Sequence, residues 1–551
     1  MLLGRKFTVS AKHFSLSLTR IFYYDKQEKI VKETVMKTKI FFVLFILLTI
    51  IVKSVGFSEE LEEEKAVNLS LSGYYRVRGI SFNNVEYLDP SLNSVVKDSK
   101  TAYLQQRLRL EPKFRIAEGV SINMQADVLD DAIWGDNSCY VNGSYDPTVP
   151  GCGVPALAGN PSALGWNYLY QYENRMFVVK RVWAEASTPL GELHFGRMTS
   201  HWGLGLLDND GNGFRNEWGD AHFGNTTDRI EFLARPAGKE KPYRIAVGYD
   251  KTVEGIIPQK PGEPIDDIDR WFIKPYYCGA DCSAGSPDRF IGAFIGYRVQ
   301  PKTETKILEA DAYLMFKFLE NYIVKFDMLY LVGASNAFGD LQAGDEPDTD
   351  PNDIIPDKVT VNAPNAVLKL IYDEQPFQLG LEAGYASGDR NGGYNSNKQL
   401  NAYTWNPDYN VGLLMFEELI ARQSSAYAQG IAESTDVSLV PLVATKGGVR
   451  NATYAMITPK FYLIDNFVEA KMNVLWGMLN EKSMNPFGGN YYGTNTAGKN
   501  LGLELDWGIE MGMNLKTGVQ VGYFWPGNAF KGPNGNHPNM FTMQIRLTVP
   551  F

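Results

Sequence analysis

Histidine, cysteine and long apolar segments are all scarce in this chain. It has 5 His and 4 Cys among 551 residues, and its formal net charge is −10. Catalytic chemistry that uses histidine therefore has few candidates, and the acidic balance argues against a nucleic-acid partner. Residues 40–52 form the one long apolar run, so the sequence also argues against a helical membrane protein.

That apolar run is predicted to be the core of a signal peptide. Lys37 and Lys39 precede it, and the small residues Ser54 and Gly56 follow it. The alternative, an uncleaved anchor, would need about 20 apolar residues. We expect cleavage near Gly56 of a signal peptide at residues 36–56. Residues 1–35 are interpreted as an upstream start-codon artefact, which leaves 57–551 as the mature chain.

The four cysteines form two local pairs in turn-prone segments. Cys139 lies near Cys152, and Cys278 lies near Cys282. In an oxidising compartment these pairs are predicted to be loop disulfides. A zinc site is the alternative, but the pairs are far apart and lack Cys-x-x-Cys spacing.

The last strand gives the clearest evidence of fold. From Phe541 to Phe551 apolar and polar residues alternate without a break, as in a strand with two different faces. In a lipid-embedded barrel the apolar face meets hydrocarbon and the polar face, here with Arg546, meets the lumen. A soluble sandwich would alternate too, but the terminal Phe551 resembles the last strand of bacterial outer-membrane barrels.

The same alternation recurs upstream, often with charges at the polar positions. A wet lumen tolerates such charges, whereas a packed apolar core does not. Short and long connections also take turns, as expected of tight turns at one end and longer loops at the other. The predicted short links lie at 117–119, 189–191, 236–242, 319–321, 374–376 and 464–466.

The predicted fold is all-β, a transmembrane antiparallel β-barrel. About seventeen strands are clear, but a barrel with both ends in the periplasm needs an even number, so we expect about eighteen, with sixteen as the fallback. The missing strand is assigned to 270–277, which is weak because Pro275 removes a ladder donor.

Inward-facing charges are the candidate functional residues. The early strands contribute a basic arc, and the later strands contribute a more acidic wall. Opposed arcs can select a charged or polar solute through the focused potential, although inward charges that pair across strands would only stabilise the sheet. The predicted pore-lining residues are Arg76, Arg78, Arg107, Arg109, Arg181, Arg229, Arg235, Arg244, Glu382, Glu469, Glu504, Asp506 and Arg546.

Two further motifs are weaker. Asp208, Asp210 and Asn212 stand at alternate positions beside glycines, which suits a calcium loop, although an ordinary Asx-rich turn explains them too. His201 and His222 flank this segment, so a rim enzyme is conceivable, but no Gly-x-Ser-x-Gly elbow accompanies them. We therefore expect no enzyme and no required cofactor, with calcium as a candidate ligand in an outer loop.

Three stretches resemble outer-membrane barrels of the alginate-export type and their uncharacterised porin-like relatives. They are GRMTSHWGLG at 196–205, GYASGDR at 384–390 and NPDYNVGLLMFE at 406–417. The resemblance implies an eighteen-stranded barrel. In alginate exporters an Arg-rich constriction attracts an anionic polymer, and the basic arc here is similar, but the acidic wall departs from a uniformly positive conduit.

The function expected from the sequence is a passive channel for small polar or charged solutes in the outer membrane of a Gram-negative bacterium. Its expected partners are outer-membrane lipids, the assembly machinery acting on the C-terminal strand, and the solutes. The alternatives are an exporter of anionic polysaccharide and a structural or adhesion barrel with an occluded lumen. Residues 391–450 bear on all of these, because a loop folded inward would narrow the pore.

Overall fold

The computed structural model describes the barrel from residue 68 onward. The described residues are 68–89, 94–135, 140–141, 144–145, 177–211, 216–220, 224–238, 241–252, 268–279, 288–301, 304–336, 359–389, 399–421, 423–424, 445–464, 467–482, 498–512, 514–531 and 535–551. The predicted signal peptide and the segment before it lie outside them, as do Cys139, Cys152, Asn212, His222 and Cys282.

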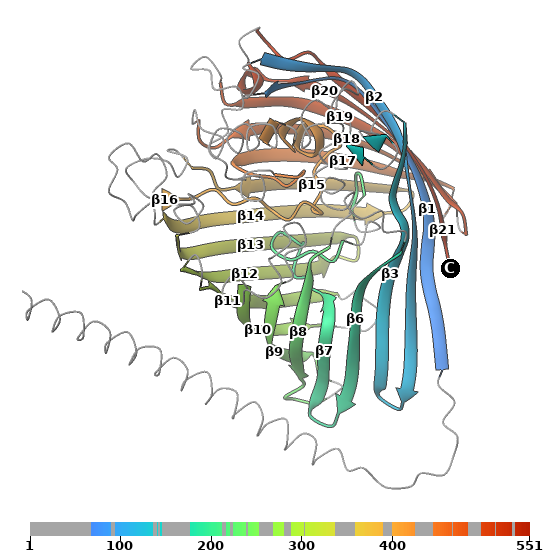
Figure 1. Ribbon diagram of the computed structural model, residues 1–551, viewed down its shortest axis with the longest axis vertical. Coiled ribbons are helices and arrows are strands. Elements are labelled where there is room, and N and C mark those ends of the chain that lie inside the picture. The colour runs from blue at the N-terminus through green and yellow to red at the C-terminus, as the bar shows by residue number, and fades with distance from the viewer. Residues whose placement is uncertain are drawn as a thin grey trace, which may run out of the picture. The chain divides into compact units, whose positions relative to one another are not determined.

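The described chain forms a closed antiparallel β-barrel of 18 strands, which confirms the predicted fold class (Figure 1). The barrel strands are β1 (Asn68–Asp89), β2 (Ser94–Ala117), β3 (Val120–Gly135), β6 (Phe177–Thr188), β7 (Gly191–Thr199), β8 (Thr226–Ala234), β9 (Tyr243–Thr252), β10 (Ile268–Cys278), β11 (Arg289–Gln300), β12 (Thr305–Phe318), β13 (Tyr322–Ser335), β14 (Val359–Glu374), β15 (Phe377–Ala386), β17 (Ala452–Ile464), β18 (Val468–Leu479), β19 (Asn500–Met511), β20 (Lys516–Pro526) and β21 (Met540–Pro550).

Three short strands lie outside this ring. β16 (Gln399–Leu400) pairs in parallel with β14, and β4 (Tyr140–Val141) pairs with β5 (Ser144–Tyr145).

The barrel closes where its last strand meets its first. β21 pairs with β1 along the register from Tyr74 and Pro550 to Asn83 and Phe541. Beyond that ladder, Gly73 and Phe551 exchange two backbone hydrogen bonds of 2.9 and 3.0 Å. The alternating C-terminal segment is therefore the strand that completes the barrel, and no strand edge remains at this seam.

Four of the predicted short links, at 117–119, 189–191, 319–321 and 374–376, are confirmed as tight turns between neighbouring strands. The links at 236–242 and 464–466 also join neighbouring strands, but they include residues outside the described ones. They lie at the end of the barrel that holds Asn68 and Phe551, called the turn end below; the opposite end is called the loop end. The weak strand is confirmed as β10. Its ladder with β9 runs through Pro275, but its ladder with β11 omits Lys274 and Pro275, so the missing N–H faces β11.

The outward face of the strands is apolar. Ile545, Leu547 and Val549 of β21 each leave 42–43% of their surface exposed, and the other strands repeat this pattern. Aromatic pairs flank the apolar band, with Tyr322 beside Tyr372 near the turn end and Tyr523 beside Trp525 near the loop end. An apolar belt between two aromatic girdles is typical of a barrel embedded in a bilayer.

The helices within the described residues are short. They include a π-helical turn at Met415–Ile420, after which residues 421 and 423–424 are also helical, and a 3-10 turn at Asn528–Phe530. Among the described residues, no helix has the length and apolar character needed to cross a membrane.

In the half of the barrel nearest the loop end, the interior is packed with side chains. This differs from the water-filled lumen predicted from the sequence. Two loops fold into the barrel. The loop that follows β7, called the first inward loop below, buries Trp202, Leu206 and Trp218, and the loop that follows β15, called the second inward loop, buries Trp405 and Phe416. Inward side chains of the wall pack against them, among them Phe294, Leu329 and Tyr454. The described parts of 391–450, which are residues 399–421, 423–424 and 445–450, therefore include an inward-folded segment rather than a loop that stands outward.

Candidate functional site

The inward loops are held by polar side chains of the barrel wall. Glu504 of β19 accepts hydrogen bonds from the backbone N–H groups of Leu413, Leu414 and Met415, at 2.5, 2.8 and 2.6 Å. The carboxylate thereby binds donors at the start of the π-helical turn that have no partner within a helix. Glu504 and Asp506 face inward as predicted, but both are fully buried under this loop.

Three other wall residues also accept hydrogen bonds from the inward loops, two from backbone N–H groups and one from a side chain. Asp327 of β13 accepts from Leu204 N at 2.5 Å, and Gln520 of β20 accepts from Gly219 N at 3.1 Å. Asn365 of β14 accepts from the indole Nε1 of Trp405 at 2.9 Å. The wall thus fixes both inward loops at several separate points.

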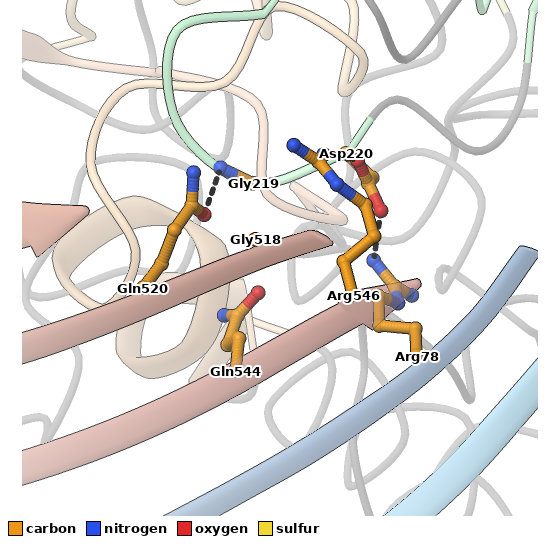
Figure 2. A pocket seen from close by; sticks show the side chains of 7 residues that line it. All are labelled: Arg78, Gly219, Asp220, Gly518, Gln520, Gln544 and Arg546. Carbon is orange, nitrogen blue, oxygen red and sulfur yellow. Dashed lines mark hydrogen bonds and ion pairs between the residues drawn. The ribbon is translucent and has the colours of Figure 1, made fainter. Parts of the chain in front are cut away.

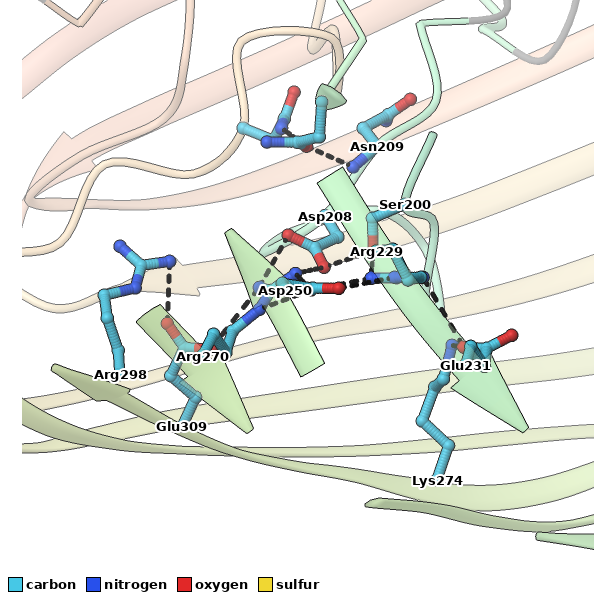
Figure 3. Close-up of polar contacts among 12 residues, drawn as sticks. Ser200, Asp208, Asn209, Arg229, Glu231, Asp250, Arg270, Lys274, Arg298 and Glu309 are labelled. Atoms are coloured by element: carbon cyan, nitrogen blue, oxygen red, sulfur yellow. Dashed lines mark hydrogen bonds and ion pairs between the residues drawn. The ribbon is translucent and has the colours of Figure 1, made fainter. Parts of the chain in front are cut away.

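A compact charge network joins β8, β9, β10, β11 and β12 to the first inward loop (Figure 3). Arg270 lies at its centre and binds Asp208 at 2.8 Å and Asp250 at 2.7 Å. Arg229 binds Asp250 at 2.6 Å and approaches Glu231. Its described members are four cations and four carboxylates: Arg229, Arg270, Lys274 and Arg298 with Asp208, Asp250, Glu231 and Glu309.

Because the charges in this network balance and most are buried, we assign them to holding the loop against the wall. Removing a single member would leave an uncompensated buried charge. The network also bears on the calcium prediction. Both carboxylate oxygens of Asp208 accept from Arg270, and Oδ2 also accepts from Ser200. Burial alone would raise the pKa of Asp208, but Arg270, Ser200 and Arg229 hold it well below its usual range.

The remaining calcium candidates do not form a ligand cluster among the described residues. No group of three or more His, Cys, Asp or Glu side chains in this part of the chain could hold a metal ion. Asp210 lies 3.8 Å from Nδ1 of His201, and Asn212 is outside the described residues. Calcium binding in this loop stays a prediction.

Most members of the predicted basic arc are buried. Arg76, Arg78, Arg107, Arg109 and Arg181 each expose no more than 7% of their surface. Arg109 forms a bidentate pair with Asp127, at 2.7 and 2.9 Å, and lies over the ring of Tyr74. Arg181 donates to Gln125 and to loop carbonyl groups.

Arginines face one another across the seam of the barrel. Arg76 is directly opposite Arg107 in the register of β1 and β2, and Arg78 is directly opposite Arg546 in that of β1 and β21. Like charges in opposed positions destabilise a sheet unless a counter-charge lies between them. The counter-charge here is Asp220, which comes from the first inward loop.

Asp220 meets three of these guanidinium groups, and Figure 2 shows two of them, those of Arg78 and Arg546. Its carboxylate lies 3.2 Å from Arg76 and 3.6 Å from Arg78, and it pairs closely with Arg546. Burial would raise the pKa of Asp220, but Arg546, Arg76 and Arg78 hold it well below its usual range. A polar pocket adjoins this carboxylate and is lined by Arg78, Gly219, Asp220, Gly518, Gln520, Gln544 and Arg546.

Toward the turn end the inward charges become accessible to solvent. Lys113 and Glu185 pair at 3.1 Å with side chains 38% and 32% exposed, and Glu192 pairs with Arg235 at 2.5 Å. Lys460 joins Glu469 to Glu217, and Arg546 reaches the partly exposed Glu510 at 2.8 Å. The interior is thus wet and charged below the packed loops.

The other predicted pore-lining residues are also placed by their contacts. Glu382 is buried and accepts from the hydroxyl groups of Tyr409 and Tyr454 while pairing with Lys369. Arg244 is half-buried and donates to backbone carbonyl groups near its own strand. Asp506 accepts from Asn473 at 2.9 Å.

Several important residues were not predicted. Asp250 and Arg270 lie at inward positions of β9 and β10 but were not predicted as site residues, and the role of Asp220 as a counter-charge was not predicted either. A usable signal was present in the second loop, because residues 411–416 read VGLLMF. So apolar a segment is unfavourable in a loop that stands in water, and favourable in one that packs inside a barrel.

One described cysteine supports the prediction of oxidised pairs. Cys278, at the end of β10, is disulfide-bonded, and no described cysteine is free. Its predicted partner Cys282, like Cys139 and Cys152, is outside the described residues.

Comparison with known proteins gives no sequence-level relative. No family model matches the chain, and no curated protein matches it. Among solved structures, OccK9 (OpdG) of Pseudomonas aeruginosa aligns with 88% of this chain and 99% of its own, at 10% identity and a TM-score of 0.46. OccK2 (OpdF) of the same organism, in complex with glucuronate, aligns over 88% and 98% at 10% identity and a TM-score of 0.44. Similarity at this level supports no conclusion about the function of this chain.

Proposed function

We propose that this barrel is an outer-membrane channel for small polar or charged solutes, with a passage narrowed by its two inward loops. The single observation that carries the proposal is the contrast between its two faces. The outside is an apolar belt that suits lipid, whereas the inside toward the turn end carries solvent-accessible charges. A wet, charged interior favours the entry of polar solutes.

The proposed preference is for anions. Across β21, β1 and β2 the arginines Arg76, Arg78, Arg109 and Arg546 face inward, and the carboxylates that pair with them among the described residues are Asp220, Asp127 and Glu510. Glu510 is also bound by Lys471. Among the described residues these pairs leave an excess of positive charge on this side of the interior, and such an excess would raise the local concentration of anions.

An occluded barrel with a structural or adhesive role is the second candidate. The burial of residues 411–421 under Glu504 favours it, because this packing leaves little room in the loop half. Export of an anionic polysaccharide receives less support, since a continuous polymer needs a wider conduit and the charge network around Arg270 is neutral.

Conductance of the refolded protein in planar bilayers tests the channel directly. We expect discrete conductance steps and a reversal potential that indicates preference for anions in a salt gradient. Absence of any conductance at several voltages would refute the channel and favour the occluded barrel. Block of the current by uronate oligomers, but not by single uronates, would favour polymer export.

A further inference from the structure

The pocket beside Asp220 has the chemistry of an anion site. Its lining includes the guanidinium groups of Arg78 and Arg546 and the amides of Gln520 and Gln544. Arg78 and Gln520 are 95% and 94% buried. Within the described residues, Nε of Arg78 and Nε2 of Gln520 are buried donors without a hydrogen-bond partner.

Buried donors that lack a partner are costly, and they mark a place where an acceptor is expected. Both donors line the same pocket, and one of them belongs to Arg78, which opposes Arg546 across the seam. A small anion would satisfy the donors and offset the excess positive charge at once. A cation there would meet Arg78 and Arg546 and be repelled.

The same arginines already hold one carboxylate, that of Asp220. This side chain belongs to the loop rather than to the wall, and its backbone neighbour Gly219 is tied to Gln520 by one hydrogen bond. Gly219 has a φ of +63°, and a Cβ atom at this position would lie 2.8 Å from the side chain of Asn410. The first inward loop is therefore tightly packed at Gly219. The carboxylate of Asp220 therefore lies at the edge of the pocket, where the carboxylate of a bound solute would lie.

We propose that Arg78, Arg546, Gln520 and Gln544 form a binding site for the carboxylate group of a small solute, and that Asp220 is a built-in competitor for it. An incoming carboxylate takes over the guanidinium groups, and the loop segment 216–220 is released from the wall. The site thus deepens the proposed channel function, on which its role in transport rests, although its occupancy can be measured without transport.

Titration calorimetry in detergent, with sodium acetate as the probe, tests the site. If Asp220 leaves the site open less than a tenth of the time, Asp220→Asn should tighten acetate binding about tenfold or more. Glu217→Gln is the matched control, because it removes the same charge from the same loop but its partner is Lys460. Arg78→Gln should abolish binding.

Unchanged or weaker acetate binding in Asp220→Asn would overturn the competition, and retained binding in Arg78→Gln would overturn the location. Chloride or sulfate that binds more tightly than acetate would overturn the assignment to a carboxylate. Acetate binding without conductance would refute the channel and leave the site intact. Conductance without acetate binding would refute the site and leave the channel intact.

A second measurement keeps the proposal testable if Asp220→Asn does not fold. Trp218 is fully buried two residues before Asp220. Acetate should increase the quenching of tryptophan fluorescence by acrylamide in the unmodified protein, because Trp218 becomes accessible. This increase should be absent in Trp218→Phe. Equal gains in both proteins, or no gain in either, would refute release of the loop.

Discussion

Among the contacts described above, the one between Glu504 and the second inward loop is where a single substitution should most increase the conductance of the channel. Glu504→Gln keeps the shape of the side chain but replaces one oxygen by an NH₂ group. Because an NH₂ group is a donor, it could not accept the hydrogen bond that the replaced oxygen accepts from a backbone N–H group. Losing charge-assisted hydrogen bonds of this kind costs about 1.5–3 kcal/mol each.

The structure sets the expected magnitude. Glu504 accepts three such bonds, and the amide oxygen of glutamine can keep one or two of them. A net loss of about 3 kcal/mol in loop docking would raise the released fraction of the loop by roughly a hundredfold. The strand ladders of β19 are untouched by this change, so the barrel itself should stay folded.

Bilayer recording and limited proteolysis together provide the assay. We expect Glu504→Gln to show larger or more frequent conductance steps and faster cleavage within 399–424 than the unmodified protein. Glu510→Gln is the control, because it lies on the same strand and faces inward but binds Lys471 and Arg546 rather than the loop. If Glu504→Gln matches the unmodified protein in both measurements, the loop is not held by this carboxylate.

Three further predictions follow from the charges of the interior. Arg107→Ser combined with Arg109→Ser should lower the preference for anions, seen as a shift of the reversal potential toward cation selectivity, whereas unchanged selectivity would make the basic arc purely structural. Arg270→Met leaves Asp208, Asp250 and Glu309 without their shared partner and should destabilise the barrel by about 3–5 kcal/mol, measured by urea unfolding in detergent, with the surface change Arg197→Met as a neutral control. Burial, aided by Glu418 and Asp408, raises the pKa of Glu417 well above its usual value in the docked loop. Docking should therefore be tightest below the ordinary glutamate pKa of about 4.3 and weaken as pH rises above it, so proteolysis of 399–424 should speed up from pH 5 to pH 8 and Glu417→Gln should remove that dependence.

The barrel was predictable because its signals are local and repeated. Alternation in β21 and β19, together with the short links, follows from the two-residue period of a strand and needs no knowledge of distant contacts. Even β10 could be inferred, since an odd number of strands cannot bring both chain ends to one side. Its Pro275 was tolerated because the missing N–H costs only a local break in one ladder.

The interior was not predictable to the same degree, because it depends on pairings between distant segments. Alternation placed Glu504 and Arg78 on the inward face but could not tell that loop residues cover them. Asp208 has the spacing of a calcium ligand, and only the fold brings Arg270 to it. The alternation along a strand predicts whether a side chain points into or out of the barrel. Its contact partner inside the barrel depends on where the inward loops pack, which the local sequence does not specify.

The position of Asp220 has a consequence for how the barrel is assembled. Arg78 and Arg546 oppose each other at the junction of the first and last strands, and their counter-charge comes from a loop made early in the chain. When that loop is already inside, Asp220 screens the repulsion between the two arginines as the final strand docks, and Glu510 of β19 also pairs with Arg546. We therefore expect entry of the first inward loop to favour closure, so that a chain whose first loop fails to enter should pair β21 with β1 more weakly.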